Sequence, residues 1–594
     1  MVPPSEKETP IPPTPVVEKT VNLRSLATSR VWWLRVVGAV VSGLLLCCAF
    51  APLEWDVTIW FALPAVLMVP PPPSLRGRFL LGWLLGLVFC IPNLAWLNEV
   101  GFGAGFLLAL VIACYPMLWY VGACAMAREL CDTGDADASG SAGQSAGQSA
   151  WYIEGAWRQI AFSFAVALLW VALEWIRSWL FTGFPWNQLG ICLWQRRGLL
   201  QVTTITGVYG LSFLIVCTNM ALLYWMRRLH RPTPGRGKPR RGISWPVLFA
   251  GALFAPVLFC TLRAPRLPEP KDYLRVLSVQ GNIPQCRIPT IEQSEEATSV
   301  YTGITRLQAV VTEPDLVIWP ESAIPEFITR PVFRQTLSDL VSEIKAPLLL
   351  GAIDARLAPG TTVNDQGQYE PPPMVFNSAY LLGIDGKTKQ FYDKIHTVPF
   401  GEFTPFAEYL PWLVEWIGMG RGLTRGTEYT VFDLGKGVKA GVNICFEDVF
   451  PEISGQFVLH GANMLMTITN DAWYAESAGS RQHAVHAIFR AVETRRPLFR
   501  AGNNSDTCLV LPNGQMTDLL HDPVTGNRFV RGAKVYRLPV WDAADLGITF
   551  YTRHGDIFAK LCSLAAAGIL VWLAWRAGIR RRRLRIVIEG EKGP

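Results

Sequence analysis

Long apolar runs divide this chain, and they constrain its fold more than any other feature. Eight of them approach the roughly 20 residues that an α-helix needs to cross a bilayer. They cover residues 33–52, 56–71, 77–97, 104–126, 159–180, 204–226, 244–263 and 557–576. The second run is short and bounded by prolines. Half of all residues are apolar and the mean hydropathy is +0.25, so we predict an α-helical membrane bundle of about eight transmembrane helices.

Basic residues fall on one side of the membrane when all eight runs are counted as spans. They precede the first run, join the second to the third, and follow the sixth and the eighth. Positively charged flanks stay in the cytoplasm, so we expect a multi-pass protein of the cell inner membrane whose region 264–555 is periplasmic. The same flanks account for the net charge of +7, and we therefore expect no nucleic-acid partner.

The runs also predict a domain organisation. We expect a flexible cytoplasmic N-terminus (1–30), a membrane domain of seven transmembrane helices (31–263), an extracytoplasmic catalytic domain (264–555), a C-terminal transmembrane helix (556–576) and a basic cytoplasmic tail (577–594). Residues 1–18 are proline-rich, and residues 132–150 are small and polar. Neither composition can bury a core, so both segments are predicted to be flexible.

Between the last two apolar runs, short β-rich segments alternate with helical ones, which favours an α/β domain. The predicted strands are 274–279, 316–319, 348–351, 375–382, 441–444 and 464–469. The predicted helices are 291–312, 331–344, 450–460 and 482–495. Residues 360–373, rich in proline and polar residues, are interpreted as a loop insertion. Catalytic groups in such domains lie where strands end.

Three chemically capable side chains occupy such positions. Glu321 follows an apolar strand and Trp-Pro, where partial burial would suit a general base. Taken alone, an N-cap or a solvated acid opening the next loop is the more ordinary interpretation. Lys394 lies in an aromatic, strand-like run, where a fixed ammonium can stabilise an oxyanion. The alternative is a surface lysine whose aliphatic stem packs on an aromatic ring. Cys445 follows a buried-looking strand and precedes a helix, a position that pushes a thiol toward the thiolate form. The alternative is that Cys445 is an unreactive cysteine packed in the core. Since that region holds only Cys286, Cys445 and Cys508, at least one thiol there is expected to be free.

Together these residues resemble the Glu–Lys–Cys triad of the nitrilase superfamily. The order and context match: WPE at 319–321, YDKIHTVPFGE at 392–402, NICFED at 443–448 and ITNDAW at 468–473. GNIPQ at 281–285, RAVETRRPLFRAGNN at 490–504 and TGFPW at 182–186 add to the resemblance. Combined with eight spans, the chain resembles the apolipoprotein N-acyltransferase family over roughly residues 33–576.

The resemblance implies an α-β-β-α sandwich and a two-step acyl transfer without cofactor or metal. The donor is a membrane phospholipid, and the acceptor is the α-amino group of the N-terminal S-diacylglyceryl-cysteine of an apolipoprotein. Glu321 acts as general base, Lys394 stabilises the oxyanion, and Cys445 is the nucleophile that carries a thioester. Glu402 resembles a second acidic residue of the family, which either orients Lys394 or adjusts the strength of Glu321 as a base. Glu447 either accepts a hydrogen bond that shapes the turn or has a purely structural role.

Two further segments leave alternatives open. Residues 403–418 place Phe406 and Tyr409 at helical spacing near Trp412 and Trp416, which indicates either an amphipathic lid that admits lipid or an ordinary packed helix. Glu174 and Arg177 lie three residues apart near the end of the fifth span. They either pair with each other or contact a lipid headgroup.

Rival functions remain at this point. A membrane-tethered nitrilase-like amidase acting on a small amide would use the same triad, although one span would suffice to tether it. A transporter with a large sensor domain predicts paired charges along several spans, and these spans carry few.

Overall fold

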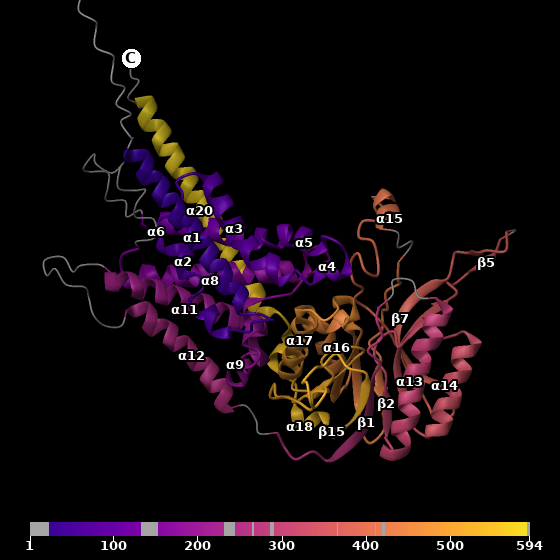
Figure 1. The fold of residues 1–594 in the computed structure, drawn as a ribbon. Helices are drawn as coiled ribbons and strands as arrows, with labels where there is room; N and C mark the ends of the chain where they lie inside the picture. Colours follow the sequence, from indigo (N-terminus) through magenta and orange to yellow (C-terminus); the bar gives the residue numbers. More distant parts are fainter. Residues whose placement is uncertain are drawn as a thin grey trace, which may run out of the picture.

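The computed structural model consists of a helical bundle and a globular domain that lie end to end (Figure 1). It describes residues 23–131, 153–230, 244–263, 267–285, 290–364, 366–409, 411–417 and 422–590. The segments predicted to be flexible at 1–18 and 132–150 lie outside these residues, as does Cys286.

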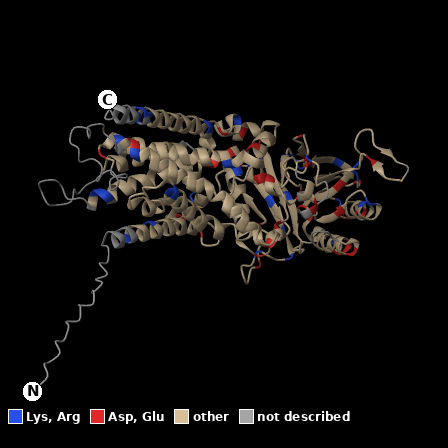
Figure 2. Ribbon diagram, turned by 90° about the horizontal axis from the view of Figure 1, so that it is seen from above, with Lys and Arg blue, Asp and Glu red and all other residues tan. Residues whose placement is uncertain are grey.

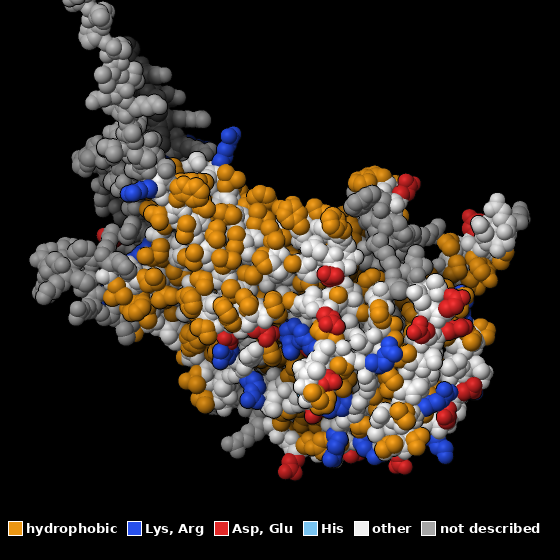
Figure 3. All heavy atoms as spheres, viewed as in Figure 1, with side chains coloured by type: hydrophobic (Ala, Val, Ile, Leu, Met, Phe, Trp, Pro, Cys, Tyr) orange, Lys and Arg blue, Asp and Glu red, His pale blue; other side chains and the backbone are white. Residues whose placement is uncertain are grey.

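Seven helical stretches within the described residues are long and apolar enough to cross a bilayer. They are formed by α1 (Leu23–Cys48), α3 (Leu75–Asn93), α5 with α6 (Ala104–Ile112 and Cys114–Cys131), α8 (Ala156–Trp179), α11 (Val208–His230), α12 (Trp245–Arg263) and α20 (Ile557–Gly590). Apolar side chains cover the visible face of this bundle (Figure 3). Such a surface is suited to lipid rather than water.

The second predicted span, 56–71, is wrong as a membrane-length helix. The chain there forms a 3-10 helix, η1 (Asp56–Phe61), and a five-residue helix, α2 (Pro64–Met68). Proline explains both limits, because Pro64 is tolerated only in the first turn of a helix and the Pro70–Pro73 run cannot continue one.

These short elements nevertheless return the chain along α1. Thr58 Oγ1 donates a hydrogen bond of 2.7 Å to the carbonyl of Leu45, late in α1. Arg35 Nε, earlier in α1, donates one of 2.7 Å to the carbonyl of Pro70. In the first turn of α3, Arg78 Nε donates to the carbonyl of Pro72 over 2.8 Å. Helices α1 and α3 therefore begin at the same end of the bundle, and the short elements between them lead the chain back to that end.

Short elements join the passes: α4 (Leu97–Val100), η3 (Leu180–Thr182), η4 (Leu189–Leu193), α9 (Arg197–Leu200) and α10 (Thr203–Thr206). Lys and Arg gather at the end of the bundle away from the domain, and few charges lie along its middle (Figure 2). At that far end, Arg580 of α20 pairs with Glu129 of α6 over 2.9 Å. Helix α20 runs on to Gly590, well past the end of the span predicted at 576.

Two sheets form the core of the globular domain. The first has the order β15-β1-β2-β4-β7-β8, with β3 paired to β4; the second has the order β14-β13-β12-β11-β10-β9. The strands of the first sheet are β1 (Asp272–Gln280), β2 (Leu316–Ile318), β3 (Ile324–Phe327), β4 (Leu348–Arg356), β7 (Met374–Leu382), β8 (Thr388–Asp393) and β15 (Gly532–Val540). Those of the second are β9 (Val431–Asp433), β10 (Lys439–Ile444), β11 (Met464–Thr469), β12 (Leu498–Gly502), β13 (Cys508–Val510) and β14 (Met516–Thr517).

Alternation along β1 shows how the layers stack. Val276 faces the core shared with the second sheet, whereas Leu277 faces the core beneath α13 (Ile291–Thr312) and α14 (Pro331–Ile344). Strand side chains alternate between faces, so the two sheets lie face to face between helix layers. On the other side α16 (Pro451–Leu459) and α17 (Ala478–Thr494) lie between the second sheet and the bundle (Figure 1). This is the predicted α-β-β-α sandwich.

All six predicted strands and all four predicted helices of this domain are present, with shifts of a few residues at their ends. The predicted insertion at 360–373 is an exposed hairpin of β5 (Thr362–Val363) and β6 (Tyr369–Glu370). The remaining short elements are α15 (Pro411–Ile417), η5 (Cys445–Val449), η6 (Asp471–Tyr474), α18 (Ala543–Leu546) and α19 (Phe550–His554).

Candidate active site

The three predicted catalytic side chains meet where strands of the two sheets end. Glu321 follows β2, Lys394 directly follows β8, and Cys445 directly follows β10. All three are buried, with at most 5% of any of these residues exposed. Both Glu321 and Lys394 lie near enough to Cys445 to act electrostatically on its thiol. Residues separated by more than 120 positions in the sequence therefore share one pocket region.

Both carboxylate oxygens of Glu321 accept hydrogen bonds. Oε1 accepts from Asn377 Nδ2 over 2.8 Å and lies 3.4 Å from Nζ of Lys394, while Oε2 accepts from the backbone N–H of Asn470 over 2.9 Å. Asn377 is a buried residue of β7. These contacts fix the orientation of the carboxylate, as a general base requires.

Lys394 has a second and closer counter-ion. Its Nζ lies 2.8 Å from Oε1 of Glu402, whose Oε2 accepts from the backbone N–H of Val398 over 2.8 Å. Burial opposes the charge on Lys394, but Glu402 and Glu321 outweigh it and raise the pKa of the lysine above its ordinary value. The lysine is therefore a fixed ammonium, available to stabilise a developing oxyanion.

Cys445 lies in a strained turn. Its φ is +53°, in the left-handed region that costs a non-glycine residue energy and that recurs at functional sites. Burial, and then the charge of Glu321, raise the pKa of its thiol well above the ordinary value, while Lys394 lowers it. The resting thiol is therefore protonated, and a base must remove its proton before it attacks.

Glu447, the second predicted supporting acid, fastens this turn to the segment that carries Lys394. Its Oε1 accepts from the hydroxyl of Tyr392 (2.8 Å) and from the backbone N–H of Ile395 (2.7 Å) and His396 (3.1 Å), and its Oε2 accepts from the N–H of Ile444 (2.8 Å). Burial raises the pKa of Glu447 to about 7, against the effect of these donors. Its contacts shape the turn.

A buried charge cluster lies behind the nucleophile. His483 Nε2 is 3.0 Å from Asp448 and Nδ1 is 2.8 Å from Asp471, while Arg500 lies 2.6 Å from Asp471 and 3.4 Å from Asp448. Nε2 also lies 3.3 Å from the carbonyl oxygen of Cys445. Burial opposes the imidazolium, but the two carboxylates raise the pKa of His483 to about 9. With His483 protonated, two cations balance two carboxylates.

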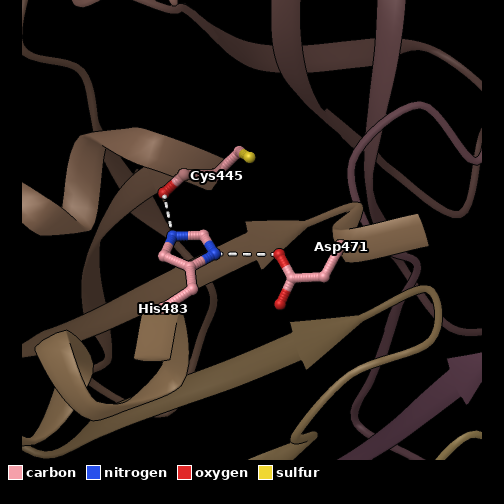
Figure 4. Close-up of side chains that lie close together, drawn as sticks. All are labelled: Cys445, Asp471 and His483. Carbon is pink, nitrogen blue, oxygen red and sulfur yellow. Dashed lines mark hydrogen bonds and ion pairs between the residues drawn. The ribbon is translucent and has the colours of Figure 1, made fainter. Parts of the chain in front are cut away.

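The same cluster includes three groups of the kind that bind metals. Ligand atoms of Cys445, Asp471 and His483 lie within 4.8 Å of one another. Figure 4 shows, however, that the sulfur of Cys445 points away from the imidazole, whose nitrogens face the backbone carbonyl of Cys445 and the carboxylate of Asp471. Because both ring nitrogens are already used, this donor set suits an internal ion cluster rather than a metal. The absence of cofactors stays a prediction.

Aromatic side chains from the membrane bundle cover the nucleophile turn. Trp186 stacks on Phe446 with ring centres 6.2 Å apart and lies 5.8 Å from the ring of His483. Trp96 contacts both Trp186 (5.0 Å) and Tyr474 (4.5 Å). The nucleophile turn therefore lies at the boundary between the domain and the bundle, in contact with side chains of both.

The segment predicted as a lid is helical only in part. Helix α15 covers residues 411–417, so Phe406 and Tyr409 precede it in turns. Tyr409 is 80% exposed, Trp412 62% and Phe406 52%, while the side chain of Trp416 lies outside the described residues. The ring of Phe406 contacts that of Phe181, which is in the bundle loop (6.3 Å). Helix α15 stands clear of the domain layers (Figure 1).

Comparisons with known proteins place this site in a family. Residues 42–221 match the family model for the apolipoprotein N-acyltransferase N-terminal domain, and residues 278–522 match that for carbon-nitrogen hydrolase. An apolipoprotein N-acyltransferase from Geobacter metallireducens is 32% identical over 91% of this chain and 95% of its own length. The chain belongs to the apolipoprotein N-acyltransferase family. It is an acyltransferase with a nitrilase-superfamily domain and a helical membrane bundle.

Further relatives agree. An apolipoprotein N-acyltransferase from Allorhizobium ampelinum is 29% identical over 82% of this chain and 87% of its own. Among solved structures, an amidase from Nesterenkonia sp. is 16% identical, covering 46% of this chain and 93% of its own, with a TM-score of 0.32.

Several residues of the site escaped the sequence analysis. Asp471 lies two residues after the end of β11, so the rule that singled out Cys445 at a strand end also points to it. Arg500 interrupts an apolar strand, which is a signal of a buried ion pair. Asn377 carries no such signal, because a neutral amide inside a strand is ordinary; only the register of β7 against β8 places it beside Lys394, whose N–H donates to its carbonyl.

Proposed function

We propose that this chain transfers a fatty acyl chain from a membrane phospholipid to the α-amino group of the N-terminal S-diacylglyceryl-cysteine of apolipoproteins. The observation that carries the proposal is the convergence of Glu321, Lys394 and Cys445 in one buried cluster at the boundary between domain and bundle. The names of the relatives, matched over most of their length, indicate the acceptor.

In the first step Glu321 takes the thiol proton and Sγ of Cys445 attacks the acyl carbonyl of the phospholipid. The charge that develops on the carbonyl oxygen is stabilised by the ammonium of Lys394. The ester bond breaks, and the leaving alkoxide takes the proton from Glu321, so a lysophospholipid departs. The acyl chain remains on Cys445 as a thioester.

In the second step the free α-amine of the acceptor attacks the thioester carbonyl. Glu321 accepts a proton from the attacking nitrogen, the C–S bond breaks, and the proton returns to the thiolate of Cys445. Sulfur serves both steps, because a thiolate is a good nucleophile and a good leaving group. The product is an amide, and the enzyme regains its starting state.

The proposed orientation places the catalytic domain in the periplasm, with a membrane domain at 31–263 and a last span at 556–576. Its support is the distribution of charge: Lys and Arg gather at the end of the bundle away from the domain (Figure 2), and basic residues are retained on the cytoplasmic side. Cysteine labelling of an exposed domain position such as Val524 in intact cells tests this orientation.

The exposed aromatic side chains of residues 403–418 are proposed to form a lid that dips into the bilayer interface. Trp and Tyr favour that depth, where their rings meet acyl chains and their polar edges meet water. The contact between Phe406 and Phe181 ties the lid to the bundle loop that leads to Trp186.

Intact-mass measurement of an acyl adduct tests the proposal. The full chain in detergent, incubated with phospholipid, should gain the mass of one acyl group on Cys445, and C445A should gain none. Mass spectra of lipoproteins from cells that lack the chain should show free α-amines, restored to amides by the wild-type chain and not by C445A. An unmodified Cys445 together with unchanged lipoprotein N-acylation would instead favour a small-amide hydrolase.

A further inference from the structure

Arg177 lies in the last turn of a membrane-spanning helix, at the end of α8 nearest the catalytic domain. It is 5% exposed. Its side chain lines a narrow cavity between α3, α6 and α8. The lining is otherwise largely aromatic and apolar, comprising Phe89, Tyr115, Pro116, Trp119, Trp170 and Leu173 together with Glu174 and Asn187. Tyr115 and Leu173 are partly exposed and form its outer rim.

The guanidinium has no close counter-ion within the described part of the chain, and the charge of Glu174 acts on it only from farther away. No carboxylate there lies within 4.0 Å of it, and its Nε is buried without a hydrogen bond. Its one described contact is with the ring of Tyr115, at 6.0 Å. A buried charge is normally paired, because leaving it unpaired costs several kcal/mol.

Glu174, one turn earlier on the same helix, is the obvious partner, but its Oε1 is used elsewhere. It accepts from Trp170 Nε1 and from the backbone N–H of Leu189, both over 2.8 Å. The ion pair that three-residue spacing would favour is therefore not formed. Arg177 is left as a fixed cation that shares the cavity with Glu174 but forms no ion pair with it within 4.0 Å.

The cavity is adjacent to the catalytic pocket. Phe184 N–H donates to the carbonyl of Arg177 over 2.8 Å, and the ring of Phe184 stacks on Trp186, which in turn stacks on Phe446 beside Cys445. Asn187, the residue after Trp186, lines the cavity itself. A group bound at Arg177 is thus linked to the nucleophile turn through a short run of contacts.

We infer that this cavity binds the phosphate of a membrane phospholipid through Arg177. A guanidinium presents two parallel N–H donors that match two phosphate oxygens, and it is always charged. The cavity lies at the end of the bundle nearest the domain, where a bilayer places its phosphates, so a phosphate that reaches Arg177 there leaves its acyl chains in lipid. This inference rests on the proposed function only for the lipid's role as acyl donor.

Lipid binding by the full-length protein in detergent tests the inference. The probes are dipalmitoyl phosphatidylethanolamine and dipalmitoylglycerol, which share acyl chains and differ by the phosphate headgroup. By native mass spectrometry the wild type should retain the phospholipid about tenfold or more better than the diacylglycerol, and Arg177→Gln should remove most of that preference. Equal retention of the two lipids by the wild type would overturn the inference without any variant.

Three variants sharpen the test. Arg177→Lys keeps a charge but loses the two-pronged geometry, so its preference should be intermediate. Glu174→Gln should keep or increase the preference; a loss equal to that of Arg177→Gln would show an internal ion pair and overturn the site. Lys560→Gln removes an exposed cation near the start of α20, outside the cavity, and should change nothing, whereas a matching loss there would indicate general attraction to lipid charge.

A kinetic arm identifies which lipid is bound. If Arg177→Gln slows acyl-adduct formation from phosphatidylethanolamine but not from a short-chain acyl thioester, the bound phosphate belongs to the donor. If retention falls while both rates hold, the site binds a resident phospholipid; both results support phosphate binding. Cys445→Ala should retain phospholipid yet form no adduct, so failure of the proposed chemistry is distinguishable from failure of the site.

Discussion

Glu402 lies closer to the ammonium of Lys394 than the proposed base does: its Oε1 is 2.8 Å from Nζ, against 3.4 Å for Glu321. The nearer acid therefore supplies most of the neutralisation of the lysine. This division leaves Glu321 in the looser of the two ion pairs with the lysine.

Replacing Glu402 by Gln should therefore weaken the base although Glu321 is untouched. Lys394 would then rely on Glu321 alone, which lowers the basicity of Glu321. We expect acyl-adduct formation to slow by about 10²-fold, within the range that general-base catalysis contributes, and its acid limb to move to lower pH. Rates from intact mass across pH measure both effects.

The matched control is Glu408→Gln, which removes an exposed acid six residues away in the same segment. It should leave the rate and its pH dependence unchanged. An E402Q enzyme with wild-type rates would show that Glu402 has no part in setting the basicity of Glu321.

Gly351 allows Glu321 to reach its position. A Cβ at Gly351 of β4 would lie 2.5 Å from the Cα of Glu321 and 2.9 Å from the carbonyl oxygen of Pro320, which are backbone atoms that cannot rotate away. Gly351→Ala should displace Glu321 by roughly 1 Å and reduce adduct formation about 10²-fold, because misplacement of this order disrupts catalytic geometry.

Gly303→Ala is the natural comparison. Gly303 lies in helix α13, where an added Cβ would meet no atom within 4 Å, so alanine there should keep activity and stabilise the chain by up to about 1 kcal/mol. Equal activities for the two variants would mean that the backbone at Glu321 tolerates the shift.

The position of each element followed from local patterns, whereas the contacts across the site did not. Helix α13 and strand β11 coincide with their predicted ranges because hydrophobic period and strand composition are local properties. Cys445 and Glu321 were placed at strand ends by the same reasoning. The left-handed φ of Cys445 and the role of Asn377 depend on how strands far apart in sequence are registered, which periodicity does not encode. The second span failed because proline overrides apolar composition.

Removal of the imidazole of His483 should destabilise the domain. Asp448 and Asp471 would then face each other with Arg500 as their only described cation. His483→Gln should lower the free energy of unfolding by about 3–5 kcal/mol, the usual result of removing one partner from a buried charge cluster. Thermal unfolding of the full chain in detergent measures the change.

The same residue predicts a pH dependence. The pKa of His483 is about 9 in the folded protein, against 6.5 ordinarily. Its contribution to the stability of the fold is therefore complete below pH 6.5 and is lost as pH rises through 9. The wild type should thus lose stability across that window, and His483→Gln should show a flatter curve there. A wild-type profile that stays level between these pH values would mean that His483 is neutral and does not balance the carboxylates.

Trp412 provides the test of the lid. Its side chain is exposed on α15, and a charged residue there would have to leave the bilayer interface or carry its charge into it, which costs free energy. Trp412→Glu should slow adduct formation from phospholipid vesicles about tenfold while leaving reaction with a short soluble thioester unchanged, because the soluble donor does not pass the interface. Val524→Glu, also an exposed position but far from the lid segment in the chain, should affect neither donor. Equal slowing of both donors by Trp412→Glu would assign α15 to the packing of the catalytic domain instead of to the membrane, since a damaged pocket does not distinguish where its acyl group comes from.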